Sequence, residues 1–525
     1  SNPTPLSGDH HELLIPFDGE RYSMAPVSEL EVLVRYKMSR PTRLAFSPSH
    51  HVSVFREERH RWMVSFRALD KKVREDFWLS AMLGGTGLDL RLLPHRVGNQ
   101  PGTFVAFVLP PILPVKEVEP EKDVVVAIDV TGSIGPADAE KAKKAVSFCL
   151  ERLNVGDRFN VVKIGTEPVL FADKLVPAGE KTVYEAVRFV ESLSSEGGTD
   201  LYNGLVNAVE LFPSRKRPSV VVLVGDGRSN IGLTKPQEII EGLTKYNRAR
   251  ARFFVMALGK QADVAFLDKI AAATGGKLIH FSEKTGFEET MSRFFSGFSQ
   301  PDASRLSMTW LDNTPEDVLP TPIPDIFRQE GVVLTGGYVG GADKTVRVKL
   351  SGVVRNRTET VTKSFPLPGS EPGHPYVPAL WAMRKAANLL EKNRLKAPDT
   401  SETSPAAEPA REFGFLLPAH QGKSGAGAAK TDPGLGFWLL KNSLVPSDVW
   451  APSCAFVQWK PFRLQGGVWT DTRVNPGMPT SRIPFLSEAY FRLLKEHPEL
   501  GRFMALGPEV RFVQGDRCLE ITTSR

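Results

Sequence analysis

Five side chains with oxygen ligands fall in three short segments of the sequence. Asp129, Thr131 and Ser133 stand at alternate positions in the run Asp-Val-Thr-Gly-Ser. Thr199 follows a Gly-Gly pair, and Asp226 lies between two glycines. Carboxylate and hydroxyl oxygens are hard ligands, and with water they supply the octahedral shell that Mg²⁺ or Mn²⁺ prefers. These residue types predict a cation site, provided that the fold brings the three segments together.

An alternation of strands and helices from residue 123 to about residue 300 would bring them together. Short Val- and Ile-rich runs are typical of strands covered on both faces of a parallel sheet, and helical patterns separate them. Strands are predicted over 124–128, 159–164, 220–224, 253–258 and 277–281. Helices are predicted over 136–153, 182–193, 201–212, 236–248 and 264–273. The pattern predicts a doubly wound α/β domain, in which ligands bind at the carboxyl ends of the strands, where Asp129 and Asp226 fall.

The five residues resemble the metal-ion-dependent adhesion site of von Willebrand factor type A domains, which are Rossmann-like. The family's first motif is Asp-x-Ser-x-Ser, and here Thr131 takes the middle position, keeping the hydroxyl but adding a methyl group. The resemblance implies that Ser133, Thr131 and Thr199 bind the ion directly or through water. It implies that Asp129 and Asp226 hold the ion largely through water. The ion would be Mg²⁺, or else Mn²⁺ or Ca²⁺, and an Asp or Glu carboxylate of a protein partner would fill its open position.

Each segment taken alone has a simpler interpretation. Thr199-Asp200 is typical of a helix N-cap, and Gly-Asp-Gly is typical of a tight turn. Other kinds of site fail on spacing. An aspartic protease needs a contiguous Asp-Thr-Gly twice, whereas Val130 intervenes here and no second copy exists. Neither a dinucleotide fingerprint nor a phosphate-binding loop is present. The order and spacing of all three segments therefore favour the adhesion site.

Composition and charge exclude several other classes of protein. With 525 residues, 41% of them apolar and 24% charged, the chain is long enough for several globular domains. A net charge of +6 is too small to indicate a nucleic-acid partner. Apolar runs such as 104–109 and 253–258 are far shorter than the roughly 18 residues of a membrane span. We therefore expect a multidomain protein with no direct membrane span.

We expect the α/β domain over 123–300. The regions on both sides of it have patterns typical of β-strands. Residues 1–112 predict a β-rich, sandwich-like module, and 301–420 predict a β module with a helix over 376–395. The run Asp76-Phe77-Trp78-Leu79 and the strand near 102–110 resemble the end of the VIT module in inter-alpha-trypsin inhibitor heavy chains and their bacterial relatives. So does the Leu380-Trp381-Ala382 run that opens the later helix. Because only the later part of the VIT module is matched, its earlier strands are either absent or completed by another chain.

The rest of the chain predicts a small C-terminal α+β segment over 456–525, with a helix over 487–496. Low-complexity stretches at 396–411 and 421–436 predict mobile loops, with a short strand over 413–417 between them. Three cysteines are too few for a disulfide scaffold: Cys149 lies on a helix core stripe, and pairing of Cys454 with Cys518 stays open. The chain opens without an initiator Met or a signal-like apolar core, so we expect a processed chain.

The resemblance implies a non-enzymatic, metal-dependent protein-binding and adhesion scaffold. It also implies a location outside the cytoplasm, either secreted, periplasmic or at the cell surface, although a cytoplasmic location stays open. The alternative is a structural subunit of a larger envelope or surface assembly in which the metal site is vestigial. An enzyme would require a cleft with convergent titratable groups in the terminal segment, because the three motifs contain no obvious base.

Overall fold

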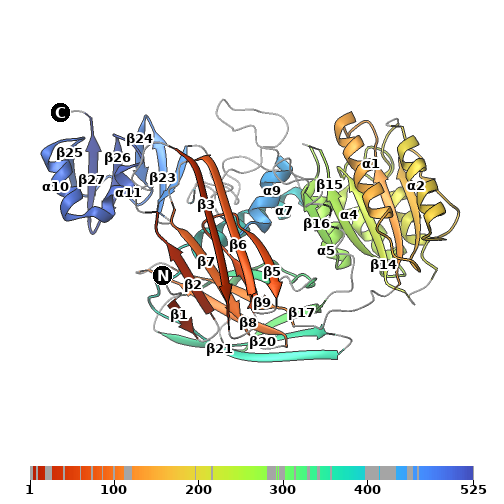
Figure 1. The fold of residues 1–525 in the computed structure, drawn as a ribbon, viewed down its shortest axis with the longest axis horizontal. Helices are drawn as coiled ribbons and strands as arrows, with labels where there is room; N and C mark the ends of the chain where they lie inside the picture. The colour runs from red at the N-terminus through yellow and green to blue at the C-terminus, as the bar shows by residue number, and fades with distance from the viewer. Residues whose placement is uncertain are drawn as a thin grey trace.

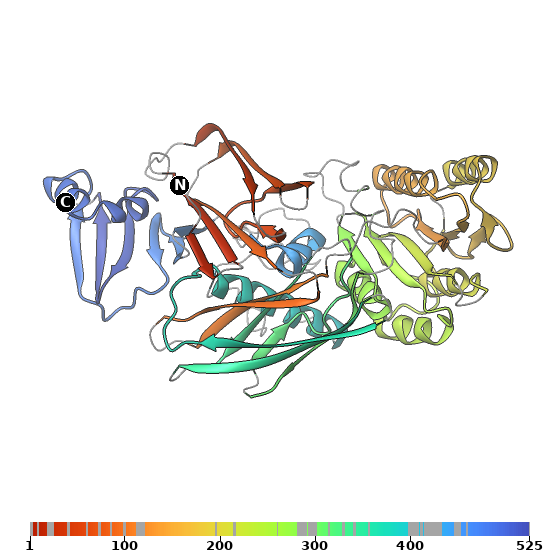
Figure 2. The ribbon, with the colours of Figure 1, turned by 60° about the horizontal axis from the view of Figure 1, so that its bottom comes forward.

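The computed structural model places three bodies in a row, with the α/β domain at one end, a β body in the middle and a small α+β body at the C-terminal end (Figures 1 and 2). The structure describes residues 4–7, 10–17, 26–38, 42–58, 61–71, 75–84, 87–97, 101–111, 121–194, 197–213, 217–259, 261–280, 291, 294, 302–312, 315–327, 331–339, 343–354, 357–396, 409, 413, 433–445, 453–457 and 460–523.

The α/β domain is built on a seven-stranded sheet with strand order β12-β11-β10-β14-β15-β16 and β13 paired to β11. Its strands are β10 (Asp123–Asp129), β11 (Arg158–Ile164), β12 (Val169–Leu170), β13 (Val176–Pro177), β14 (Ser219–Gly225), β15 (Arg252–Ala257) and β16 (Lys277–His280). Its helices are α1 (Pro136–Leu150), α2 (Glu180–Ser192), α3 (Leu201–Glu210), α4 (Pro236–Tyr246) and α5 (Val264–Thr274). Five strands pair in parallel, and β12 and β13 are antiparallel to β11. The predicted doubly wound α/β domain is confirmed, with element ends that differ by a few residues.

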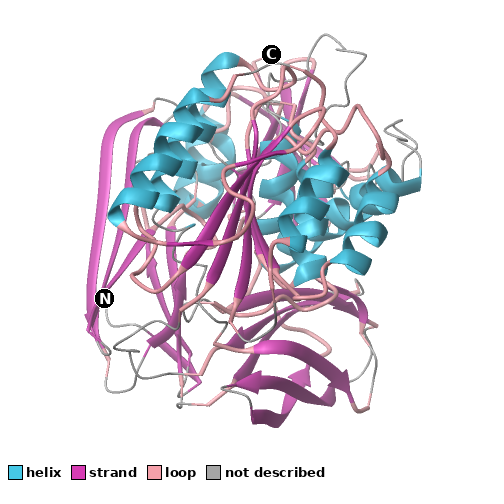
Figure 3. Cartoon of the chain, turned by 90° about the vertical axis from the view of Figure 1, so that its right-hand side faces the viewer, coloured by secondary structure: helices cyan, strands magenta, loops and turns pink. Residues whose placement is uncertain are grey.

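Helices cover both faces of this sheet, as Figure 3 shows. Alternate residues of a strand point to opposite faces, so Val124, Val126 and Ile128 of β10 pack in the same core as α1 and α2. Val125 and Ala127 of the same strand pack with α3, α4 and α5. Every residue of β10 is buried, which explains its continuous apolar run.

The β body consists of four sheets that form two sandwiches. The first sandwich pairs the sheet β1-β2-β7-β4 with the sheet β3-β6-β5, and the second pairs β18-β19-β9-β8 with β17-β20-β21. Its strands are β1 (Thr4–Ser7), β2 (His10–Ile15), β3 (Val27–Lys37), β4 (Thr42–Phe46), β5 (Ser53–Glu58), β6 (Arg61–Lys71), β7 (Phe77–Leu83), β8 (Asp89–His95), β9 (Gly102–Leu109), β17 (Ser304–Trp310), β18 (Glu316–Leu319), β19 (Val332–Tyr338), β20 (Lys344–Val354) and β21 (Arg357–Leu367). All pairings among these strands are antiparallel.

One strand pair joins the chain before the α/β domain to the chain after it. Strand β9 pairs with β19 along its length, from Gly102 opposite Tyr338 to Val108 opposite Val332. One face of β9 lies in the second sandwich, and the other packs with helix α7 (Val377–Lys396), so all of its residues are buried. The ranges 1–112 and 301–420 therefore share a sheet, and the α/β domain is an insertion between two strands of it.

Helix α7 packs against β9 and β19 of the β body, and α9 (Pro433–Asn442) lies between α7 and the α/β domain (Figure 1). The helix predicted over 376–395 is confirmed as α7. Helix α9 (Pro433–Asn442) begins inside the stretch 421–436 that we predicted as a loop, and for residues 433–436 that prediction is wrong. The buried side chains Phe437 and Leu440 hold α9 in the same core as α5 and α7, which outweighs the low helix propensity of its two glycines. Of the strand predicted over 413–417, only Phe413 is described, and it is helical.

The C-terminal body has a six-stranded sheet of order β22-β23-β24-β26-β27-β25. Its elements are β22 (Cys454–Val457), β23 (Lys460–Gln465), β24 (Val468–Asp471), β25 (Thr480–Pro484), α10 (Glu488–Glu496), the 3-10 turn Pro498–Leu500, α11 (Gly501–Met504), β26 (Val510–Gln514) and β27 (Arg517–Thr522). The predicted helix over 487–496 is confirmed as α10. Cys149, Cys454 and Cys518 are free thiols, and three strands separate Cys454 from Cys518 in the sheet.

Within the described ranges, we find no helix with the length and apolar character that crossing a membrane requires.

The β9–β19 pairing yields a test with two adjacent glycines of β19. A Cβ at Gly336 would lie 2.4 Å from the Phe104 ring, whereas a Cβ at Gly337 would meet its nearest atom, on Trp381, at 3.5 Å. Phe104 is fully buried and cannot move aside, so Gly336→Ala should lower the free energy of unfolding by about 1–3 kcal/mol. Gly337→Ala is the matched control. Urea unfolding measures both, and equal losses would contradict this packing.

Candidate metal centre

The sheet order brings the two predicted carboxylates to one edge. Strand β10 lies between β11 and β14. After β10 the chain passes to β11 on one side of it, and it later returns to form β14 on the other side. Ligands of such sheets bind at this switch point, outside the carboxyl ends of the strands. Asp129 ends β10, and Asp226 follows β14 directly. Gly225 lets the end of β14 lie close to the Asp129 side chain, because any Cβ at this position would be only 2.8 Å from the Asp129 Cβ.

The first motif folds around the Asp129 carboxylate. Oδ1 of Asp129 accepts hydrogen bonds from the Thr131 backbone N–H at 2.9 Å and from the Thr131 hydroxyl at 2.8 Å. Oγ1 of Thr131 also lies 2.5 Å from Oγ1 of Thr199 and 3.3 Å from Oγ of Ser133. The three predicted hydroxyl ligands thus gather beside one carboxylate.

The Thr199 hydroxyl is held in place by a loop that we did not predict to contribute. The Thr199 N–H donates to Oδ1 of Asn230 at 2.7 Å, and the Thr199 carbonyl accepts from the N–H groups of Asn230 and Ile231 at 3.0 and 3.1 Å. The Ser-Asn pair shortly after Asp226 is a turn-forming signal that could have revealed this loop. Asp200 accepts from the N–H of Asn203 and caps α3, as the N-cap interpretation predicts.

Asp226 is positioned by its own loop. Its Oδ1 accepts from the Arg228 N–H at 2.9 Å. The Arg228 guanidinium itself donates to the Gln261 carbonyl at 2.7 Å and to the Gln261 side chain at 3.1 Å. Arg228 therefore orients the carboxylate through its backbone, while its side chain is engaged with Gln261.

The two carboxylates are almost fully buried, and only one oxygen of each has a hydrogen-bond partner in the described part of the chain. Asp129 and Asp226 are 1% and 2% exposed, and Oδ2 of each has no hydrogen-bond partner among the described residues. Burial raises the pKa of Asp129 to about 6, an effect to which the charge of Asp226 adds. Burial also raises the pKa of Asp226, although the hydrogen bond from the N–H of Arg228 partly offsets this effect. Buried carboxylate oxygens without a partner are a position where a cation can bind, and this supports the predicted cation site.

All five predicted site residues therefore lie at one edge of the sheet. Thr131 and Thr199 are buried with the carboxylates, whereas Ser133 and the neighbouring Gly132 are exposed. The hydroxyl and carboxylate oxygens suit a hard divalent cation, and the exposed side gives access from solvent. Cation binding by these residues stays a prediction.

Comparison with known proteins agrees with the fold of this domain. Residues 122–279 match the family model of the von Willebrand factor type A domain. The human inter-alpha-trypsin inhibitor heavy chain H4 is 24% identical over 287 residues, covering 52% of this chain and 31% of the relative. The rat heavy chain H3 is 24% identical over 347 residues, covering 62% and 38%. The predicted resemblance is confirmed, and the chain spans about a third of the length of these relatives.

Solved structures also match parts of this chain at low sequence identity. A von Willebrand factor type A protein from Catenulispora acidiphila has 15% identity and a TM-score of 0.39, covering 59% of this chain and 83% of that chain. Proximal thread matrix protein 1 from the mussel byssus, in a structure with a zinc-occupied metal-ion-dependent adhesion motif, has 20% identity and a TM-score of 0.28. It covers 34% of this chain and 45% of that chain.

The raised pKa of Asp129 generates a test of pH dependence. Below about pH 6 its carboxyl group is protonated, so a proton competes with the cation, and above that pH the competition is absent. Lowering the pH from about 7 to about 5 should weaken Mn²⁺ binding about tenfold. Calorimetric titration measures this change. Affinity that is constant over this range would contradict a role for Asp129 in holding the cation.

Proposed function

We propose that this chain, which carries a von Willebrand factor type A domain and resembles inter-alpha-trypsin inhibitor heavy chains, is a non-enzymatic protein-binding scaffold. Its adhesion site holds Mg²⁺, Mn²⁺ or Ca²⁺ at the edge formed by β10 and β14. A carboxylate of a protein partner completes the coordination of the ion. The chain acts outside the cytoplasm, a location that rests on the resemblance alone.

The observation that carries this proposal is the pair of unpaired oxygens, Oδ2 of Asp129 and Oδ2 of Asp226, in a buried position beside three hydroxyl groups. The carboxylates supply the negative charge that retains a divalent cation, and the hydroxyls of Thr131, Ser133 and Thr199 supply further hard ligands. The five side chains include no His, Lys or Cys, and in this proposal both carboxylates are engaged in holding the cation, so neither is free to act as a base. The arrangement is therefore suited to binding rather than to catalysis.

The exposed side of the site supports capture of a partner carboxylate. Ser133 and Gly132 are open to solvent, and Ile231 is an exposed apolar residue in the loop that holds Thr199. A cation held by two carboxylates largely through water keeps a strong field toward this side, so an incoming Asp or Glu gains electrostatic attraction. A neighbouring apolar contact at Ile231 would add affinity for a partner's chain.

Metal binding is tested by thermal unfolding of chelator-stripped protein with and without Mg²⁺ or Mn²⁺. At about 100 times the dissociation constant, the native state gains about 2.7 kcal/mol, which raises the melting temperature by about 5–10 °C for a domain of this size. Asp226→Ala should abolish the shift. Asp173→Ala, which removes an exposed carboxylate of the same domain, is the matched control and should keep it. A shift that survives in Asp226→Ala would place the metal elsewhere.

Carboxylate capture is tested with immobilised full chain and peptides that differ only by Glu or Gln. The Glu peptides should bind in Mn²⁺, lose binding in chelator, and fail to bind the Asp226→Ala variant, because the open position requires a charged oxygen ligand. Equal binding of Glu and Gln peptides would contradict carboxylate capture. A natural partner whose binding is unchanged by Asp226→Ala would favour the structural subunit with a vestigial site.

A further inference from the structure

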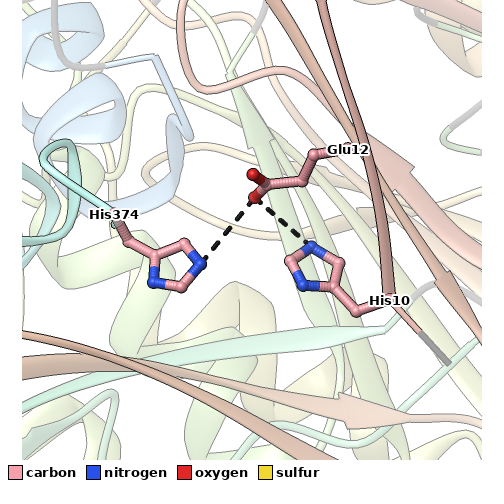
Figure 4. A group of neighbouring side chains, drawn as sticks. All are labelled: His10, Glu12 and His374. Atoms are coloured by element: carbon pink, nitrogen blue, oxygen red, sulfur yellow. Dashed lines mark ion pairs between the residues drawn. The ribbon is translucent and has the colours of Figure 1, made fainter. Parts of the chain in front are cut away.

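A second group of ligand-type side chains lies in the β body, away from the adhesion site. His10 and Glu12 stand two residues apart on β2 and therefore point to the same face of their sheet. His374 comes from the segment between β21 and α7. Figure 4 shows the Glu12 carboxylate between the two imidazole rings. These three side chains, which we call the His-Glu-His cluster, offer ligand atoms that all lie within 4.8 Å of one another.

The distances in the cluster suit a small ion. Oε1 of Glu12 lies 3.4 Å from Nε2 of His10 and 3.9 Å from Nε2 of His374. An ion with bonds of about 2.0–2.1 Å holds tetrahedral ligands about 3.3 Å apart. The Glu12–His10 distance already has this value, and the Glu12–His374 distance is about half an ångström longer. All three ligand atoms lie within 4.8 Å of one another, so the two imidazoles must also approach each other, and rotation of their side chains can supply this movement.

The hydrogen bonding of His374 leaves a lone pair directed at Glu12. Nδ1 of His374 lies 3.1 Å from the Pro94 carbonyl, which can only accept, so Nδ1 carries the proton. Nε2 of His374 is then an electron-pair donor, and both it and Oε1 of Glu12 are buried without a hydrogen-bond partner among the described residues. Two such atoms repel each other across 3.9 Å unless a cation or a proton lies between them. Metal-binding histidines typically donate their other ring N–H to a carbonyl in this way.

Burial shifts the pKa values of the three side chains of the cluster. His10 and His374 are 3% and 8% exposed, and burial lowers the pKa of His10 to about 3 and also lowers the pKa of His374. Both imidazoles are therefore neutral at physiological pH, as ligation requires. Burial raises the pKa of Glu12 to about 7 although the indole N–H of Trp78 opposes this shift, and a bound cation would restore the charged form of Glu12. Nε2 of His10 now bonds the Ser80 hydroxyl at 2.7 Å, and binding would exchange this contact for the metal.

We propose that His10, Glu12 and His374 bind one divalent transition-metal ion of the Zn²⁺ class. Two imidazole nitrogens and one carboxylate oxygen select such an ion over Mg²⁺ or Ca²⁺, which prefer oxygen ligands. Water completes a fourth position. The ion links strand β2, near the start of the chain, to the segment that enters α7, so its role is structural. This site is independent of the proposed adhesion function.

The test is calorimetric titration of the metal-free full chain with Zn²⁺ in the Asp226→Ala background, which removes the adhesion site. One equivalent should bind. His374→Ala and Glu12→Gln should each weaken this binding by about ten- to a hundredfold or more, since even outer-shell partners have effects of that size. His497→Ala removes a half-exposed histidine of the C-terminal body and is the matched control. Bound Zn²⁺ should also raise the melting temperature of the Asp226→Ala protein, but not that of the protein that carries Glu12→Gln in addition.

Two results would overturn the proposal. One is the absence of Zn²⁺ binding in the Asp226→Ala background, and the other is equal affinity in Glu12→Gln and His497→Ala. Glu12→Gln keeps the shape of the side chain, so it tests Zn²⁺ binding even where His374→Ala unfolds. Circular dichroism of the Glu12→Gln variant shows whether it is folded. Failure of the adhesion site would appear instead as a missing Mg²⁺ shift in the chain with Asp226 intact, with the Zn²⁺ result unchanged.

Discussion

The position of strand β10 between two parallel neighbours is the constraint on which the candidate site depends. Because β11 pairs on one side and β14 on the other, the loops after β10 and β14 leave the same edge of the sheet side by side. Asp129 and Asp226 are thereby forced into proximity in a buried place where neither is fully paired. In the function that we propose, a divalent cation between the two carboxylates balances their charge. The loop with Asn230 then fixes the Thr199 hydroxyl that faces the first motif.

A second constraint joins this domain to the rest of the chain. The β9–β19 pairing brackets the α/β domain, and α9 packs between α5 and α7 in a single continuous core. Lys441 of α9 forms ion pairs with Asp268 of α5 and Glu391 of α7, and these charges raise its pKa despite burial. The α/β domain is therefore packed against the β body through its α5 face, while the carboxyl edge of its sheet is left with exposed groups such as Ser133.

Much of the α/β domain, and the positions of the five candidate ligands at its edge, were predictable from sequence, because the sequence patterns that mark them are local. Strands buried on both faces give continuous apolar runs, as in 124–128, and the motifs follow those strands directly. The β9–β19 pairing was not predictable, since the whole α/β domain separates its two strands and nothing local marks the register. Helix α9 was missed because Gly434 and Gly436 favour a loop, whereas the burial of Phe437 and Leu440 stabilises the helix. His374 likewise has no sequence signal that connects it to His10 and Glu12.

The most direct measurement of the central claim is a crystal structure of the full chain grown with Mn²⁺, with anomalous scattering used to locate the ion. The expected result is one peak at the edge formed by β10 and β14, at bonding distance from hydroxyls of the first motif, with a water or a carboxylate on the exposed side. A structure with no ion there, in which the Thr131 and Thr199 hydroxyls still bond each other, would contradict the account.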